Sequence, residues 1–238
     1  MKMPLLLIAT AAALLSLVLA KSQCPAYRYN TFTDAAHNAE GLRKIVARFQ
    51  GALGGINNAD MPGQKGGFRV INWDGAQLPF DMPPVAFKKN RGAQFFSSDN
   101  KFVVSNPNNS ADGVPKGDKT APPKDIRFSS LNLGQSKRFQ VFSPNRLFTV
   151  RNSNKMSSKF FVPAQKDTQD AAAVSGFGAI FTDVGDGRST LLEFYDKNGC
   201  AIAKVYAPPR SRGLSFAGII VDASYKSPIF EVKLTVGS

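Results

Sequence analysis

Residues 230–236 read Phe-Glu-Val-Lys-Leu-Thr-Val, so that apolar side chains alternate with polar ones along the whole stretch. Successive side chains of a β-strand point to opposite faces of the sheet, and the alternation predicts a strand with one buried face and one wet face. Antiparallel sheets commonly have one face on the core and the other in solvent. The stretch therefore indicates a mainly β fold.

The same kind of segment recurs upstream, from Phe68 onward. About a dozen short runs rich in Phe, Val and Ile are separated by Gly, Pro, Asn and Asp, which is typical of a β sandwich. Residues 174–184 and 214–222 are apolar on both faces and are predicted to be inner strands. Residues 196–199 read Asp-Lys-Asn-Gly, whose Asn-Gly pair favours a type I′ hairpin. We expect a jelly-roll-like β sandwich over residues 67–238.

The N-terminal segment, residues 21–66, contains the one helix that the sequence predicts, from about Asp34 to Leu53. Thr33 or Asp34 is expected to cap its start, and Gly54-Gly55 to end it. The apolar side chains of this segment fall on one stripe at helical spacing: Ala35, Ala39, Leu42, Ile45, Val46, Phe49 and Leu53. A helix with a single apolar face most often packs on its own domain.

Residues 1–20 have the features of a secretory signal peptide. Lys2 is followed by an apolar run over residues 4–19, and Ala20 is a small residue suited to a cleavage site. The alternative is a retained membrane anchor, but a membrane span needs roughly 20 apolar residues and this run is shorter. We therefore expect a secreted, extracellular protein without a transmembrane segment.

The chain is strongly basic, with 30 Lys and Arg residues against 17 Asp and Glu residues and a formal net charge of +13. Cleavage after residue 20 takes away Lys2 and no acid, which leaves +12. Outside the cell such a field suits an extracellular polysaccharide or another acidic surface rather than nucleic acid. Solubility in an acidic medium is an equally good explanation.

Both cysteines, Cys24 and Cys200, follow the predicted cleavage site. An even number of cysteines in an oxidising compartment predicts a disulfide between them. Asn108 begins an Asn-Asn-Ser sequon and is the predicted glycosylation site, in a stretch over residues 106–124 that is expected to be an exposed loop.

Catalytic residues cannot be assigned from the sequence. His37 is the single histidine, which excludes Ser-His-Asp and Cys-His systems and most zinc sites, and it is expected on the polar side of the helix. No dinucleotide or ATP motif is present. A glycosidase would need two carboxyl groups across a cleft, for which Asp74 with Asp183 or Glu193 are the candidates. The favoured interpretation of Asp74 is a turn residue before Gly75.

The carboxylates of Asp183 and Asp186 are the candidate ligands for a metal ion. They lie in the stretch Thr-Asp-Val-Gly-Asp-Gly at residues 182–187, where acids and backbone carbonyls are close together, as Ca²⁺ prefers. The spacing matches no EF-hand loop, and Asp-Gly after a strand is first of all a turn.

Exposed aromatic rings and basic side chains are the candidates for binding a glycan, since ring faces stack on sugars. Most of the 19 Phe residues lie in strand interiors and are predicted to be core. The predicted ligand-binding residues are Trp73, Tyr195, Tyr206 and Arg210.

Several phrases of the chain resemble a group of uncharacterised secreted proteins that is common in bacteria. They include Ile-Asn-Trp-Asp-Gly at residues 71–75 and Ser-Gly-Phe-Gly-Ala-Ile-Phe-Thr-Asp-Val at residues 175–184. The resemblance runs from about Phe49 to near the C-terminus and implies export and a β sandwich. It carries no binding or catalytic residue, and Gly185 departs from the group's pattern, in which an acid directly follows the Thr-Asp-Val phrase.

These observations favour a secreted, non-catalytic protein that binds an extracellular glycan or cell-wall polymer, an anionic one above all. The alternatives are a polysaccharide-acting hydrolase and an extracellular structural or interaction protein. Carbohydrate binding and a Ca²⁺ site at Asp183 and Asp186 are expectations from the sequence.

Overall fold

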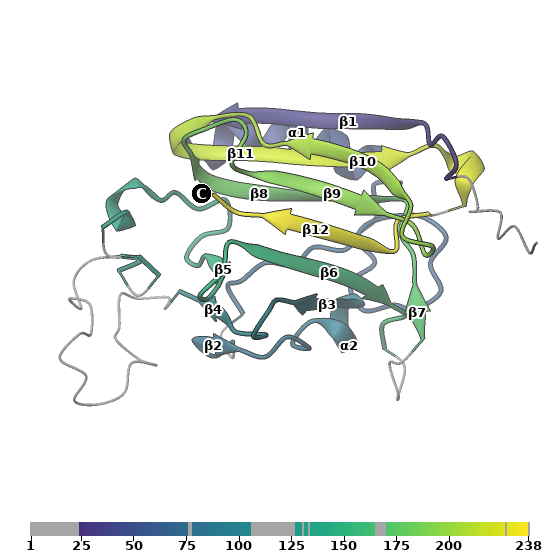
Figure 1. Cartoon of the computed structure of the whole chain (residues 1–238), viewed down its shortest axis with the longest axis horizontal. Helices are drawn as coiled ribbons and strands as arrows, with labels where there is room; N and C mark the ends of the chain where they lie inside the picture. Colours follow the sequence, from purple (N-terminus) through teal and green to yellow (C-terminus); the bar gives the residue numbers. More distant parts are fainter. Residues whose placement is uncertain are drawn as a thin grey trace, which may run out of the picture.

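The computed structural model describes residues 24–75, 78–105, 127–129, 131–132, 134–164, 170–226 and 228–237. The predicted signal peptide and the predicted glycosylation site at Asn108 lie outside these residues. Within them the chain is mainly β and forms a sandwich of two antiparallel sheets, with one long helix on the outside (Figure 1). The predicted fold class is confirmed.

The smaller layer, which we call the helix-backed sheet, has the strand order β1-β11-β8. Its strands are β1 (Tyr29–Ala36), β11 (Arg210–Val221) and β8 (Gly176–Val184). Every pair in it is antiparallel. The order places β1, the first strand among the described residues, beside β11, the penultimate one. Residues of the N-terminal segment thus form part of the sandwich itself.

The other layer, which we call the large sheet, has the order β10-β9-β12-β6-β3, with β7 pairing to β6. Its strands are β10 (Ala201–Tyr206), β9 (Leu191–Tyr195), β12 (Glu231–Thr235), β6 (Lys155–Phe161), β3 (Ala93–Phe96) and β7 (Ala171–Ala172). The remaining elements are β2 (Asp81–Met82), β4 (Phe102–Val104) and β5 (Phe148–Val150), which form a small sheet, and the short helices α2 (Lys88–Arg91), η1 (Ser136–Arg138) and η2 (Ala223–Tyr225).

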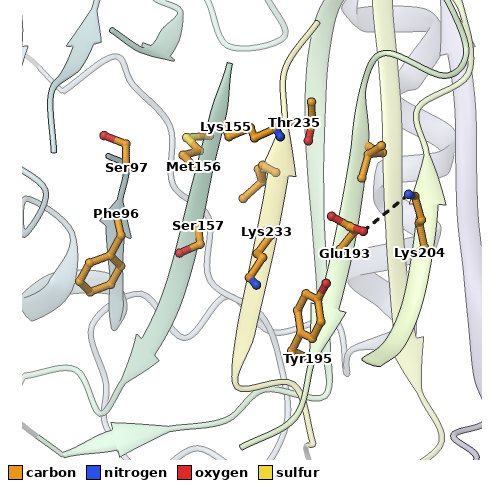
Figure 2. Close-up of a pocket in the computed structure, with 12 residues that line it drawn as sticks. Phe96, Ser97, Lys155, Met156, Ser157, Glu193, Tyr195, Lys204, Lys233 and Thr235 are labelled. Carbon is orange, nitrogen blue, oxygen red and sulfur yellow. Dashed lines mark ion pairs between the residues drawn. The ribbon is translucent and has the colours of Figure 1, made fainter. Parts of the chain in front are cut away.

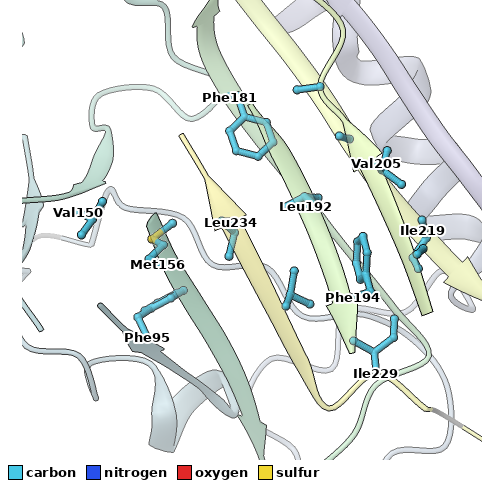
Figure 3. Packing of buried hydrophobic residues seen from close by; sticks show 14 of the residues in the cluster. Phe95, Val150, Met156, Phe181, Leu192, Phe194, Val205, Ile219, Ile229 and Leu234 are labelled. Atoms are coloured by element: carbon cyan, nitrogen blue, oxygen red, sulfur yellow. The ribbon is translucent and has the colours of Figure 1, made fainter. Parts of the chain in front are cut away.

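The main core lies between the two layers (Figure 3). Leu192, Phe194 and Val232 of the large sheet are fully buried, and Ile219 of β11 lies in the same cluster. Alternation along β12 places Val232 and Leu234 in this core and leaves Lys233 exposed, as the sequence predicts.

A second core lies under the long helix α1 (Ala39–Ala52), whose Leu42, Ile45 and Phe49 are buried against Leu214 and Phe216 of β11. β11 therefore has apolar side chains on both faces, because one face meets the helix and the other meets the large sheet. The prediction that it is an inner strand is confirmed.

The predicted start of the helix is wrong by about one turn. Residues 34–36 belong to β1, where Asp34 lies opposite Phe216, and the cap is Asn38, whose side chain accepts a hydrogen bond from the N–H of Gly41. His37 therefore precedes the helix rather than lying on its polar side. Pairing with β11 overrides local helical spacing in this segment.

Two further strand predictions need correction. β8, within residues 174–184, is an edge strand of the helix-backed sheet and not an inner one. Its apolar side chains are buried because α1 packs on one face of this sheet and the large sheet packs on the other. The turn at residues 196–199 joins β9 to β10 as expected. Among its residues only Gly199 has a positive φ, +78°, whereas a type I′ turn needs two such residues.

Gly178 and Gly218 face each other across β8 and β11. A Cβ atom on Gly178 would lie 2.6 Å from Cζ of Phe216, and one on Gly218 would lie 2.8 Å from the Cα of Gly178. The Phe216 ring, which belongs to the core under α1, occupies the space that a side chain at Gly178 would need. Close packing therefore explains Gly178 in the Ser-Gly-Phe-Gly-Ala phrase.

The predicted disulfide between Cys24 and Cys200 is present, with a Cα–Cα distance of 5.5 Å. Next to it, Tyr27 packs against Tyr225 with the ring centroids 5.0 Å apart, and the Tyr225 hydroxyl donates to the carbonyl of Ala26 at 2.8 Å. The N-terminal segment is thus fixed by a covalent bond to the residue that precedes β10 and by ring packing to η2.

None of the helices in the described ranges is both long and apolar enough to span a membrane.

Candidate functional site

The face of the large sheet that points away from the core is the candidate site, and we call it the open face. α1 packs on β1 and β11, on the far side of the helix-backed sheet, and leaves this face uncovered (Figure 1). Lys155, Lys204, Tyr206 and Lys233 on it are exposed. The outward side chains are Gln94, Phe96, Lys155, Ser157, Lys159, Phe161, Leu191, Glu193, Tyr195, Ala201, Lys204, Tyr206, Glu231, Lys233 and Thr235.

Strand register sets these side chains in rows across the sheet. One row crosses all five strands, because each residue in it is the Cα partner of the next: Lys204, Glu193, Lys233, Ser157 and Phe96. Neighbouring strands are about 4.8 Å apart, so this row extends for roughly 19 Å. The row forms the floor of a shallow depression of about 660 Å³ (Figure 2).

The depression is bordered by a second row, in which Leu191 lies opposite Thr235 and Thr235 lies opposite Lys155. Tyr206 extends this row onto β10 as the partner of Leu191. Tyr195, on the other side of the first row, also lines the depression. The depression thus combines ammonium groups, hydroxyl groups and two aromatic rings, those of Phe96 and Tyr195.

Aromatic rings contact three of the four lysines of the open face. The Nζ atom lies over a ring in four cases: Lys233 on Tyr195 at 4.5 Å, Lys204 on Tyr206 at 5.4 Å, Lys159 on Phe96 at 5.5 Å, and Lys88, from α2 at the rim, on Phe161 at 4.1 Å. Such contacts contribute about 0.5–1 kcal/mol each at exposed sites. They favour side-chain conformations that lie along the sheet.

One carboxylate on the face is already engaged, because Glu193 forms an ion pair with Lys204 at 3.6 Å. The Tyr206 side chain raises the pKa of Lys204 above its ordinary value, and the Glu193 carboxylate adds a smaller effect in the same direction. Lys204 therefore stays charged throughout the physiological range. Glu231, the second outward acid, lies opposite Lys159 and Tyr195.

Two of the four residues predicted to bind a glycan lie on the open face. Tyr195 and Tyr206 are there, on β9 and β10. Trp73 is elsewhere: its ring stacks on Phe148 at 4.0 Å and contacts Phe95, which points to the core side of β3. Trp73 thus packs with the core, on the opposite side of β3 from Phe96.

Arg210, the fourth predicted residue, lies in the helix-backed sheet opposite Val184. Its side chain is half-buried, next to a β-bulge, and its Nε atom is buried without a hydrogen-bond partner. The structure therefore does not bring Arg210 together with the two tyrosines.

Asp183, a predicted calcium ligand, is paired with an arginine. Its side chain is 8 % exposed, and both carboxylate oxygens accept from Arg138, at 2.8 and 3.2 Å. The backbone N–H of Arg212 donates to the same carboxylate at 2.8 Å. Asp183 and Arg212 both have positive φ values, 54° and 55°, so this pair closes the bulged end of β8 and β11.

Asp186, the other predicted ligand, accepts a hydrogen bond from the N–H of Arg188 at 2.9 Å within a turn. Among the described residues no three His, Cys, Asp or Glu side chains gather closely enough to hold a metal ion. Calcium binding stays a prediction.

Asp74, a candidate acid or base, belongs to a buried network instead of a cleft. Its Oδ1 atom accepts from the backbone N–H groups of Asn145 and Arg146, at 3.0 and 2.9 Å. The Arg146 side chain is 3 % exposed and donates to the carbonyls of Ser105, Gly75 and Leu78. This network joins residues 74–78 to residues 145 and 146, which lie about 70 positions further along the chain.

Sequence reasoning missed the lysines and the serine of the open face. Lys155, Ser157 and Lys159 alternate with Met156, Ser158 and Phe160 along β6, and this alternation was the available signal. Ser158, a polar residue at a buried position, weakens it. The place of Lys233 beside Ser157 depends on register, which the sequence of either strand does not contain.

Comparison of the chain with protein-family models, with curated proteins and with solved structures finds no match. The resemblance to secreted bacterial β-sandwich proteins therefore stays a prediction.

Proposed function

We propose that this is an exported protein that binds an anionic extracellular glycan across the open face of the large sheet. The observation that carries the proposal is the outward side-chain set of that face, with four lysines against two glutamates and with rings beside three of those lysines. Charge complementarity steers and selects the partner of such a surface. The disulfide and the signal-like residues 1–20 support export.

A polysaccharide fits the shape of the face better than a small molecule does. The depression is shallow and its floor extends across five strands, whereas small-molecule sites enclose most of the ligand surface. A linear polymer lying along the row from Lys204 to Phe96 would meet one strand about every 4.8 Å, a step comparable to one sugar unit. Tyrosine and serine hydroxyls along the way can bond to sugar hydroxyls.

Affinity electrophoresis through gels that contain acidic or neutral polysaccharides tests the proposal. The mature chain should be retarded by acidic polymers. The double variant Lys155→Gln with Lys233→Gln should bind them about tenfold more weakly, because it removes two of the four lysines of the face. A tenfold change in Kd corresponds to about 1.4 kcal/mol of binding free energy. The matched control is Arg43→Gln with Lys44→Gln, two exposed cations on α1, which removes the same charge from another face. Retention on none of the polymers, or an equal loss in both pairs, would contradict the proposal.

The strand register favours one second function, a polysaccharide hydrolase. Glu193 of β9 lies opposite Lys233 of β12, and Glu231 is two residues before Lys233 on β12. The two acids are therefore diagonal neighbours on the open face. Diagonal neighbours are about 7–8 Å apart at the backbone, from which two glutamate side chains can bring their carboxyl groups to the roughly 6.5–9.5 Å of inverting glycosidases. Release of reducing ends by the wild type, abolished in both Glu193→Gln and Glu231→Gln, would replace binding by catalysis.

A further inference from the structure

We infer that the open face contains a subsite for a tetrahedral oxyanion, a sulfate ester or phosphate group carried by the glycan, at Ser157 between Lys155, Lys159 and Lys233. The inference rests on the proposed function, because it names the charged group that the same face selects.

Three lysines flank Ser157 on the open face, two of them along β6 and one across from it on β12. Lys155 and Lys159 are two residues before and after Ser157 on β6, about 6.6 Å away along the strand. Lys233 is the direct partner of Ser157 on β12, at a distance of about 4.5–5.5 Å between Cβ atoms. Figure 2 shows Lys155 reaching from β6 toward β12 and Lys233 beside Ser157.

Lys159 reaches the subsite through Phe96. Phe96 is the partner of Ser157 on β3, and the Nζ atom of Lys159 lies over its ring at 5.5 Å. Ser157 is thus flanked by an ammonium group on the β3 side and by Lys233 on the β12 side. An anion above the Ser157 hydroxyl would meet positive charge on both sides and a hydrogen-bond donor below.

No carboxylate neutralises these lysines within the described part of the protein, although the Nζ atoms of Lys159 and Lys233 lie over aromatic rings. Lys155, Lys159 and Lys233 take part in no ion pair there, although Glu231 lies opposite Lys159, and the Ser157 hydroxyl makes no hydrogen bond. Like charges on neighbouring strands repel each other and cost stability. A bound anion would remove this repulsion, and that is the physical reason to expect one here.

The choice of lysine indicates which anion is recognised. Arginine presents a planar fork that matches two oxygens of a carboxylate or a phosphate at once, whereas each lysine is a compact point charge that approaches one oxygen. Three of the four ion pairs among the described residues use arginine, namely Arg138 with Asp183, Arg151 with Asp81 and Arg43 with Glu40, and the fourth is Lys204 with Glu193. The outward side chains of the large sheet include lysines and no arginine. Three separate lysines around Ser157 match the three terminal oxygens of a sulfate or phosphate ester better than the two oxygens of a planar uronic acid carboxylate, so a tetrahedral group is favoured.

The test compares dextran sulfate, phosphorylated dextran and carboxymethyl dextran of equal charge density, each binding to the immobilised mature chain. We expect the Kd for the sulfated or the phosphorylated polymer, or for both, to be at least about tenfold lower than for the carboxymethyl polymer. The two tetrahedral polymers distinguish a sulfate ester from a phosphate as the natural group. Inorganic sulfate and phosphate should compete in the same order.

Variants locate the effect. Ser157→Ala and Lys155→Gln should each reduce the preference for the tetrahedral polymer by about threefold or more, while Lys44→Gln on α1 leaves it unchanged. Circular dichroism and the melting temperature confirm that each variant is folded. Equal or tighter binding of carboxymethyl dextran, or a preference that survives both substitutions, overturns the inference but leaves the proposed function standing. Binding to none of the polymers overturns the proposed function itself.

Discussion

The Tyr27 hydroxyl donates a hydrogen bond to Oδ2 of Asp196 at 2.8 Å, which joins the N-terminal segment to the turn between β9 and β10. The other oxygen of Asp196 accepts from the backbone N–H groups of Asn198 and Cys200, both at 2.8 Å. Asp196 is 7 % exposed, so this carboxylate organises the turn and holds the segment beside the disulfide.

Tyr27 should make the protein sensitive to alkaline pH. Burial, followed by the hydrogen bond to Asp196 and its charge, raises the pKa of Tyr27 from 10.0 to about 12. A raised pKa adds stability that is complete below about pH 10 and is lost as the pH rises through about 12. In Tyr27→Phe the free energy of unfolding should change less over this range, as measured by urea denaturation. An identical alkaline profile in both proteins would contradict the assignment.

Asp196 should have the opposite effect in acid. Burial alone would raise the pKa of Asp196, but the hydrogen bonds from Tyr27, Cys200 and Asn198 outweigh it and hold the pKa below 3.8. Its contribution to stability is therefore present above about pH 4 and lost as the pH falls through the lowered pKa. We expect Asp196→Asn to be less stable than the wild type at neutral pH, with a difference that shrinks in acid. A constant difference at all pH values would refute this.

Gly178→Ala should destabilise the sandwich, because the new Cβ would lie 2.6 Å from the ring of Phe216. Overpacking of this kind costs roughly 1–3 kcal/mol. Gly185→Ala is the matched control, since nothing lies within 4 Å of its Cβ position, and its effect should stay within about 0.5 kcal/mol. Thermal denaturation of the two variants measures the difference, and equal melting temperatures would show that the helix-side core adapts.

Arg146→Lys should be costly although it keeps the charge. The guanidinium donates to three backbone carbonyls from three nitrogen atoms, and a single ammonium group cannot occupy all three positions. Each buried carbonyl left unpaired costs about 1–3 kcal/mol. Arg43→Lys, at an exposed position on α1, is the control and should be nearly neutral. Equal urea midpoints for both variants would mean that the network is not needed.

Removal of the disulfide by Cys24→Ser with Cys200→Ser should lower the free energy of unfolding substantially. The two cysteines are 176 residues apart, and closing a loop of that length in the unfolded chain corresponds to roughly 5 kcal/mol. Guanidinium denaturation with and without reductant checks this. Only the wild type should respond to the reductant, and an unaffected midpoint would show that Tyr27 and Tyr225 hold the segment without the bond.

Periodicity in the sequence was enough to predict the fold class. Alternation over residues 230–236, the apolar run of β11 and the number of cysteines gave a sandwich, an inner strand and a disulfide that the structure contains. Each of these features depends on residues that are close in sequence or on simple counting.

Features that depend on contacts between distant segments could not be predicted. β1 was assigned in part to the helix because its pairing with β11 is not visible in residues 29–36. Trp73 was expected on the surface because the rings of Phe87 and Phe148 that cover it come from other elements. The open face was missed as a site for the same reason, since its rows exist only once five strands are in register.

The pairing of β1 with β11 also has a consequence for how the chain folds. Tyr29 lies opposite Val221, so β1 cannot complete its pairing until about 190 further residues have been made. Folds dominated by such distant contacts form slowly, and strand edges that wait for a partner can associate with other chains. A protein truncated before β11 would therefore lack the helix-backed sheet. During refolding, a low protein concentration should give more native protein than a high one, because unpaired strand edges then meet other chains less often.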